Sequence, residues 1–193
     1  YNLGILYGAG RGVSKNEVQA EKWFKLSAEQ GHLGAQYNLG KLYQNGRRIV
    51  DYRTGCIDSN GSNIMCNYPV NHAAALKWFT LAAKQGHDNS QVSLGDIYHR
   101  GMGTSKDPKA AMIWWRRAAE QGNTLGQMKL GAMYTGWDGT GAEELGITDP
   151  VYSYMWFSLA AFNSKREQYT QQIIQGMNEL EKKMSLSQKD QAL

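Results

Sequence analysis

The residues of this chain that could perform covalent or metal chemistry are few and scattered. The 193 residues include 4 histidines and 2 cysteines, and no His-Glu-x-x-His motif, phosphate-binding loop or nucleophile elbow occurs. Four ligands at a spacing suited to zinc are also missing. We interpret the acidic pair Glu143-Glu144 as part of a solvated loop, with a general acid/base pair or a calcium contact as the alternative. We therefore predict that the chain is not an enzyme and holds no metal or cofactor.

The histidines are best explained without catalysis. His32 and His87 each follow a Gln-Gly pair at equivalent positions, which predicts a structural role for both. His72 lies beside a predicted helix cap. His99 is expected near the end of a helix, where a surface contact is the simplest interpretation. A hydrolase would need a clustered nucleophile, base and acid, and serine, histidine and acidic residues do not meet at matching places.

Both cysteines, Cys56 and Cys66, lie in one polar segment with IDSNGSNIM between them. Asn60-Gly61, near its middle, is a strong turn signal, so the cysteines could face each other across a small hairpin or loop. We predict a Cys56–Cys66 disulfide, which would remove roughly 3 kcal/mol of loop entropy. A disulfide implies an oxidising compartment such as the periplasm. Two free thiols in a cytosolic loop are the alternative.

A repeated pattern supplies the elements that would position these residues. Leu-Gly, followed three residues later by Tyr, begins at Leu3, Leu39, Leu94 and Leu130. A Trp-aromatic pair recurs at Trp23, Trp78, Trp114 and Trp156, with Asn or Asp seven residues earlier and a pair of small residues after it. Two of the leucine spacings are 36 residues, so the basic unit has about this length.

Each unit reads as a helix hairpin. Leu, Gly and Tyr at i, i+1 and i+4 share one helical face. Glycine costs about 1 kcal/mol within a helix, so its recurrence at one register indicates close approach of the second helix. The Asn or Asp predicts an N-cap, which Pro108 and Pro150 follow in two units. Gln-Gly closes three units with a left-handed C-cap. The fixed register of the tryptophans predicts a core role, and the hairpins should stack.

This pattern resembles the sel-one-like repeat family, a relative of the tetratricopeptide repeats. The resemblance covers residues 1 to about 163 and is closest in LGDIYHRGMGTSKDPKAAMIWWRRAAEQG. The sequence departs from the family pattern at Arg48 and Trp137, where loop glycines are expected, and at Asn163-Ser164, where Gln-Gly is expected. We expect an all-α fold, a right-handed α/α superhelix (solenoid) of four helix-hairpin repeats with a C-terminal capping helix.

The repeats divide the chain into five parts. We predict repeat one, truncated at its N-terminus, at 1–33, repeat two at 34–88 with an inserted loop at about 47–69, repeat three at 89–124, repeat four at 125–164, and C-terminal capping helices at 165–193. The first capping helix carries an apolar stripe, namely Tyr169, Ile173, Ile174, Met177 and Leu180. Ser185 with Gln188 predicts a capping box that opens a short last helix.

The resemblance implies that a partner binds in a concave groove lined by the first helices of the hairpins. First-helix positions that differ between units are the candidates, because variation on a fixed frame is what a specific binding surface requires. They are Tyr1, Ile5, Tyr37, Lys41, Gln44, Asn45, Val92, Asp96, His99, Arg100, Met128, Ala132 and Thr135. Any one of them could instead be solvated or packed against the next repeat. The inserted loop is a second candidate surface.

Charge and hydropathy narrow the class of partner. The net charge of +4 is spread among acidic residues, so we predict no nucleic-acid binding. No apolar run approaches the roughly 18–20 residues that span a bilayer, so we predict no membrane insertion. The resemblance then implies a non-catalytic adaptor that binds a protein, periplasmic or secreted, in the bacterial envelope. The alternative is an immunity protein that neutralises a type VI secreted toxin, for example a phospholipase; a hydrolase is a further alternative.

Overall fold

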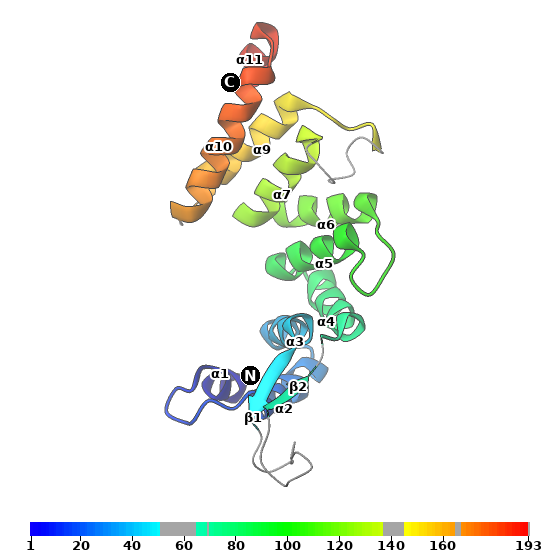
Figure 1. The fold of residues 1–193 in the computed structure, drawn as a ribbon, viewed down its shortest axis with the longest axis vertical. Helices are drawn as coiled ribbons and strands as arrows, with labels where there is room; N and C mark the ends of the chain where they lie inside the picture. The colour runs from blue at the N-terminus through cyan, green and yellow to red at the C-terminus, as the bar shows by residue number, and fades with distance from the viewer. Residues whose placement is uncertain (51–64, 69, 137–144, 165–166, 193) are drawn as a thin grey trace. The chain divides into compact units, whose positions relative to one another are not determined.

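The computed structural model describes residues 1–50, 65–68, 70–136, 145–164 and 167–192; of 47–50, 65–68 and 168 it describes the backbone. The chain divides into two compact units, Tyr1–Gln85 and Gly86–Leu193. Figure 1 shows that the described parts of both units are almost entirely helical. The prediction of a helical repeat fold is therefore confirmed at the level of secondary structure.

The first unit contains two helix hairpins. Its helices are α1 (Asn2–Ala9), α2 (Glu17–Glu29), α3 (Leu33–Asn45) and α4 (His72–Lys84). Helix α1 packs on α2, α2 on α3, and α3 on α4. Between α3 and α4, inside the predicted insertion, β1 (Arg47–Val50) pairs antiparallel with β2 (Met65–Tyr68). These two short strands are an addition to the expected all-α fold.

The register of this small sheet bears on the predicted disulfide. Cys66 lies opposite Ile49 in the backbone pairing. Cys56, the Asn60-Gly61 turn and the acidic pair Glu143-Glu144 lie outside the described residues. The disulfide therefore stays a prediction.

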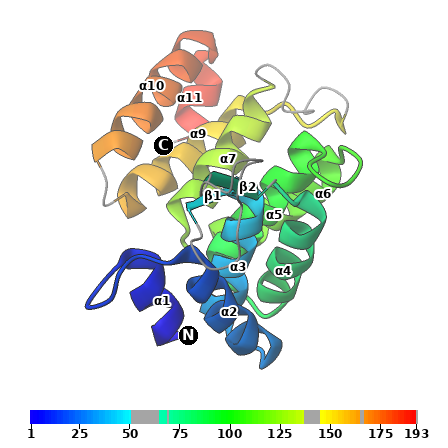
Figure 2. The ribbon, with the colours of Figure 1, turned by 60° about the horizontal axis from the view of Figure 1, so that its bottom comes forward.

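The second unit contains two further hairpins and a pair of C-terminal helices. Its helices are α5 (Asp88–Arg100), α6 (Pro108–Glu120), α7 (Thr124–Thr135), α9 (Pro150–Asn163), α10 (Glu167–Lys183) and α11 (Leu186–Ala192). Helices α5, α6, α7 and α9 pack in sequence, and both α10 and α11 pack on α9 (Figure 2). Ile173 and Leu180 of the predicted stripe on α10 are buried, whereas Ile174 is exposed, because it faces away from the core that Ile173 joins.

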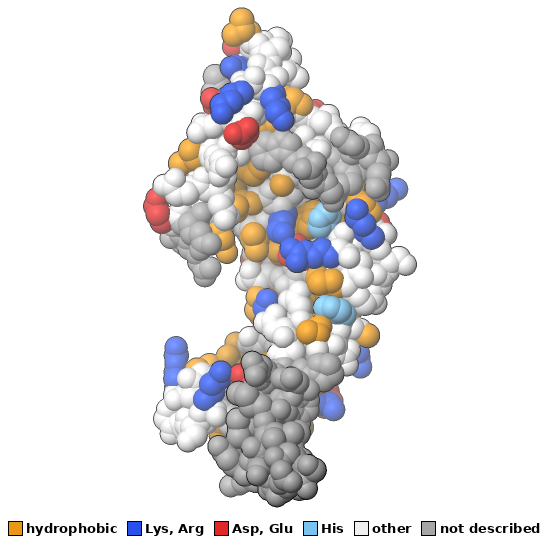
Figure 3. Space-filling view, viewed as in Figure 1, with side chains coloured by type: hydrophobic (Ala, Val, Ile, Leu, Met, Phe, Trp, Pro, Cys, Tyr) orange, Lys and Arg blue, Asp and Glu red, His pale blue; other side chains and the backbone are white. Residues whose placement is uncertain are grey.

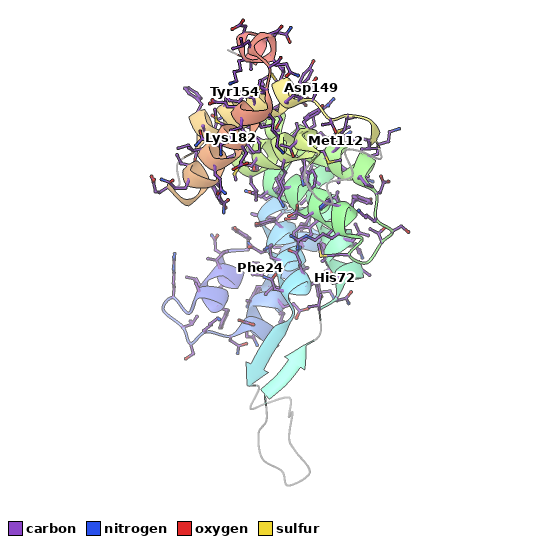
Figure 4. All side chains as sticks on the ribbon, turned by 45° about the horizontal axis from the view of Figure 1, so that its top comes forward. Phe24, His72, Met112, Asp149, Tyr154 and Lys182 are labelled. Atoms are coloured by element: carbon purple, nitrogen blue, oxygen red, sulfur yellow. The ribbon has the colours of Figure 1, made fainter. Side chains whose placement is uncertain are left out.

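The recurring glycine is where the two helices of each hairpin meet. It lies against the ring of the second aromatic residue, in the pairs Gly4–Phe24, Gly40–Phe79, Gly95–Trp115 and Gly131–Phe157. A Cβ atom added to Gly40 would lie only 2.7 Å from the ring of Phe79. The aromatic rings are buried, and Figure 4 shows Phe24 within the first unit. The close approach predicted from the glycine register is therefore confirmed.

Side-chain caps fix the start of most of the helices, although α1 begins without one. The predicted N-caps Asn16, Asn71, Asp107 and Asp149 all accept hydrogen bonds from backbone N–H groups in the first turn. The Nδ1 atoms of His32 and His87 likewise accept from the N–H groups of Ala35 and Ser90. Because each such cap contributes about 1 kcal/mol, the structural role predicted for these two histidines is confirmed. The Ser185–Gln188 capping box also forms.

In three hairpins an amide side chain at the end of the second helix bonds to a buried glutamine of the first helix. Gln85 Nε2 donates to Gln36 Oε1 at 2.9 Å, and Gln121 Nε2 donates to Gln91 Oε1 at 2.7 Å. In the last hairpin Asn163 Nδ2 donates to Gln127 Oε1 at 3.2 Å. Asn163, which departs from the family pattern, thus performs the same bonding as the glutamines it replaces.

Candidate partner-binding site

A polar cluster occupies the face of α5 and α7 in the second unit. It consists of Asp96, His99, Arg100, Lys106 and Lys129. Asp96 and His99 are three positions apart on α5, so they share one face of the helix. Lys129 comes from α7, and its Nζ lies 3.1 Å from the buried Oδ1 of Asp96, an ion pair without hydrogen-bond geometry. The cluster is therefore built by two consecutive first helices and the loop after α5.

Trp115 forms the apolar floor of the polar cluster. Its ring centroid lies 5.3 Å from that of His99, and Lys129 Nζ lies 5.7 Å from the same ring. A cation at this distance from an indole face is attracted to it. Trp115 is only 3% exposed. Among the described residues its Nε1 and the Nδ1 of His99 have no hydrogen-bond partner.

The electrostatics of the polar cluster favour a neutral histidine. Burial lowers the pKa of His99, and the cations Lys129 and Lys106 lower it further; Asp96 opposes them, and Arg100 adds to the lowering. Three cations therefore surround one carboxylate and one imidazole. Figure 3 shows basic side chains gathered beside a histidine on this part of the second unit.

The first-helix face of α3, in the first unit, is built differently. The Tyr37 ring lies 6.0 Å from the ring of Phe79. Lys41 Nζ donates to Gln44 Oε1 at 3.3 Å, and Asn45 is exposed. Lys41 is thus engaged with an amide of its own helix. This face offers mixed polar and aromatic surface.

The remaining predicted site residues have mainly local roles. Met128 packs against the core formed by α9, α10 and α11, and Thr135 Oγ1 donates to the carbonyl of Ala132 at 2.6 Å. Val92 is not on the accessible face: it is 3% exposed and shares a core with residues of α6 and α7. Small side chains on α6, Ala111 and Ala118, belong to the same core, so α6 approaches α5 closely enough to cover Val92.

Lys106, Trp115 and Lys129 belong to the site but were not among the predicted residues. Two signals in the sequence point to Trp115 and Lys129. Trp115 is a tryptophan where the other three pairs have phenylalanine. Lys129 precedes the recurring leucine, at a place where the other units have Asn2, Asn38 and Ser93. Both departures from the repeat pattern fall on the same cluster.

A small cavity lies among the C-terminal helices, away from this cluster. It measures about 200 Å³ and is lined by Tyr154, Glu181, Met184, Lys189 and Ala192. The hydroxyl of Tyr154, a residue that Figure 4 labels, donates to Glu181 Oε1 at 2.9 Å. Burial, together with this hydrogen bond, raises the pKa of Tyr154.

Among the residues that the structure describes, no group of three or more His, Cys, Asp or Glu side chains is arranged to hold a metal ion. None of the helices described is both long and apolar enough to cross a bilayer.

Comparison with known proteins decides the family. The Sel1 repeat model matches residues 1–32, 34–57, 52–87, 89–123 and 124–161. The chain belongs to the Sel1 repeat family. Sel1 repeats form a helical solenoid scaffold, and proteins built from them are generally protein-interaction adaptors.

Individual relatives agree with this assignment. A putative sel1-like repeat-containing protein of Acanthamoeba polyphaga mimivirus is 36% identical over 118 residues, which is 55% of this chain and 22% of that protein. A protective antigen of uropathogenic Escherichia coli with an SLR fold is 34% identical, with a TM-score of 0.74 over 100% of this chain and 35% of that one. A Sel1 repeat protein from Oxalobacter formigenes is 26% identical, with a TM-score of 0.64 over 96% and 73% of the two chains.

Proposed function

We propose that this chain is a non-catalytic adaptor of the bacterial envelope, which binds a partner protein through the first helices of its repeats. The inserted segment at about 47–69 serves as a second contact. The observation that carries the proposal is the polar cluster on α5 and α7. The Sel1 repeat folds without an ion pair, a histidine or an indole N–H at the positions of Asp96, His99 and Trp115, since the other repeats of this chain lack them there. Their presence is best explained by recognition.

The unpartnered atoms of this site support a binding role. A buried polar atom without a hydrogen bond costs about 1–3 kcal/mol. Three of the five such side-chain atoms among the described residues belong to the polar cluster or to its Trp115 floor, namely Asp96 Oδ1, His99 Nδ1 and Trp115 Nε1. Such exceptions to complete hydrogen bonding need an explanation. His99 also has no described hydroxyl or carboxylate within hydrogen-bond distance of Nδ1 that would orient it as a general base.

The first-helix surface can be tested by site-specific photo-crosslinking in the native host. A benzoylphenylalanine residue replaces Asn45, at the end of the first helix α3, or Ser105, in the loop after the first helix α5; both are exposed, and neither is a residue of the polar cluster. The controls replace Glu29 or Glu120, which are exposed at the ends of second helices. We expect one stoichiometric partner to be crosslinked from the first pair and not from the second. Crosslinks confined to the control positions would contradict the proposal, and capture of a secreted toxin would select the immunity role.

The envelope location has a separate test. Thiol labelling of the non-reduced, denatured protein taken from its native compartment should find both cysteines blocked, since we predict a Cys56–Cys66 disulfide. Two labelled thiols would remove the argument for export.

A further inference from the structure

We propose that the partner presents an acidic segment to the polar cluster, and that Arg100, Lys106 and Lys129 bind its carboxylates beside His99. This inference rests on the proposed adaptor function and adds the chemical class of the partner's contact segment.

The charge balance of the polar cluster is the first argument. Its three cations face a single carboxylate, Asp96, and that carboxylate is engaged by Lys129. Arg100 and Lys106 are exposed, and no ion pair joins either of them to another described residue. An excess of positive charge on one small face attracts and orients an acidic partner.

The C-terminus of α5 offers a competing explanation for some of this charge. Cations in the last turn of a helix are favoured by the helix dipole, and this accounts for Arg100. It does not account for Lys129, which lies in the first half of α7, or for Lys106, which lies in the loop before α6. Their convergence on His99 requires a further reason, and a bound anion supplies one.

Asp96 and Trp115 hold Lys129 in place. The ion pair with Asp96 and the contact with the Trp115 ring together keep the ammonium beside His99. At the same positions on α3 the structure has Lys41 for Asp96 and Gln44 for His99, and these two side chains bond to each other. The acidic segment is therefore assigned to the third and fourth repeats and not to α3.

Binding of a carboxylate beside His99 should also be coupled to protons. The unbound imidazole is surrounded by Arg100, Lys106 and Lys129, with Asp96 alone opposing them. An added carboxylate stabilises the protonated imidazole, so the complex takes up a proton more readily than the free chain does. Affinity for an acidic peptide is expected to rise as the pH falls from 7.5 towards 6.

The test uses the full chain and a dye-labelled hexaglutamate peptide, with hexaglutamine as the neutral control. Arg100→Gln/Lys106→Gln removes two exposed cations of the cluster. Lys109→Gln/Arg117→Gln removes the same residue types from exposed positions on α6. Fluorescence anisotropy at low and moderate salt should show preferential binding of hexaglutamate, weakened about tenfold by the first double variant and less than about twofold by the second.

Two results would overturn the acidic assignment: no preference for hexaglutamate over hexaglutamine, or an equal loss of affinity in the two double variants. Neither result bears on the proposed adaptor function, because that function is tested separately by the photo-crosslinking experiment. If a partner is crosslinked from position 105 but hexaglutamate does not bind, the adaptor function is supported and the acidic segment is wrong. If hexaglutamate binds as expected but crosslinks come only from second helices, the adaptor surface is wrong.

Discussion

The first-helix face of α3 and that of α5 with α7 are built on the same glycine–aromatic contacts but differ in the side chains at their variable positions. Each recurring glycine lies against an aromatic ring, Phe79 for Gly40 and Trp115 for Gly95. On α3 the variable polar residues bond within one helix, as Lys41 does with Gln44. On α5 the variable residues reach the next first helix, where Lys129 pairs with Asp96. The comparison teaches that the fixed positions stabilise the hairpin, while the variable positions decide what the surface can recognise.

The largest expected effect on stability comes from removing an aromatic ring at the core of a helix hairpin. Phe79→Ala removes a fully buried ring, so it should lower the free energy of unfolding by about 3–5 kcal/mol. Leu81→Ala, on the same helix but 39% exposed, is the matched control and should cost less than about 1 kcal/mol. Urea unfolding monitored by circular dichroism measures both. Similar losses for the two variants would show that Phe79 is not the centre of the hairpin.

A second pair of variants compares how closely the two helices of a hairpin pack in each of the two units. A Cβ at Gly40 would lie 2.7 Å from Phe79, whereas a Cβ at Gly131 would lie 3.2 Å from Phe157. Overpacking costs about 1–3 kcal/mol of stability. Replacing glycine by alanine within a helix offsets up to about 1 kcal/mol of this cost, because alanine has the higher helix propensity. Gly40→Ala should therefore destabilise the protein clearly, and Gly131→Ala much less. Equal unfolding midpoints in urea would contradict this order.

The variable positions should have smaller effects. Asp96→Asn breaks the ion pair between Asp96 and Lys129, two side chains that are each about one-quarter exposed. The substitution should lower the free energy of unfolding by about 1 kcal/mol. Lys41→Gln breaks only a hydrogen bond within α3 and should change stability by less than about 0.5 kcal/mol. The loss in Asp96→Asn should shrink in high salt. A salt-independent loss would mean that packing, and not charge, holds α5 to α7 at this point.

The smallest effect is on the pH dependence of stability. The pKa of His99 is lowered in the folded chain from its ordinary value of 6.5, so the unfolded chain binds more protons below that pH. The resulting stability is full above about pH 6.5 and is lost as the pH falls through the folded pKa. His99→Gln should flatten the slope of unfolding free energy against pH in this window. An unchanged slope would place the titrating group elsewhere, for example at His87, whose pKa is also lowered by burial.

Periodicity explains which features the sequence could predict. Caps, glycine contacts and hairpins recur at fixed spacings, so each of them was supported by several units at once. Single exceptions to the pattern were harder to interpret. The burial of Val92 depends on how closely α6 approaches α5, and the ion pair between Asp96 and Lys129 joins residues of different repeats. Neither distance can be read from a spacing along the chain. The bonding of Asn163 likewise needed the position of Gln127.

One measurement tests most directly whether the variable first-helix positions form the recognition surface. The native partner is photo-crosslinked from position 105, beside the C-terminus of α5, or from position 120, with and without an excess of free hexaglutamate. The account predicts a crosslink from position 105 that hexaglutamate suppresses, and none from position 120. A crosslink from position 120 alone would contradict it, because the partner would then sit on the second helices, away from the polar cluster.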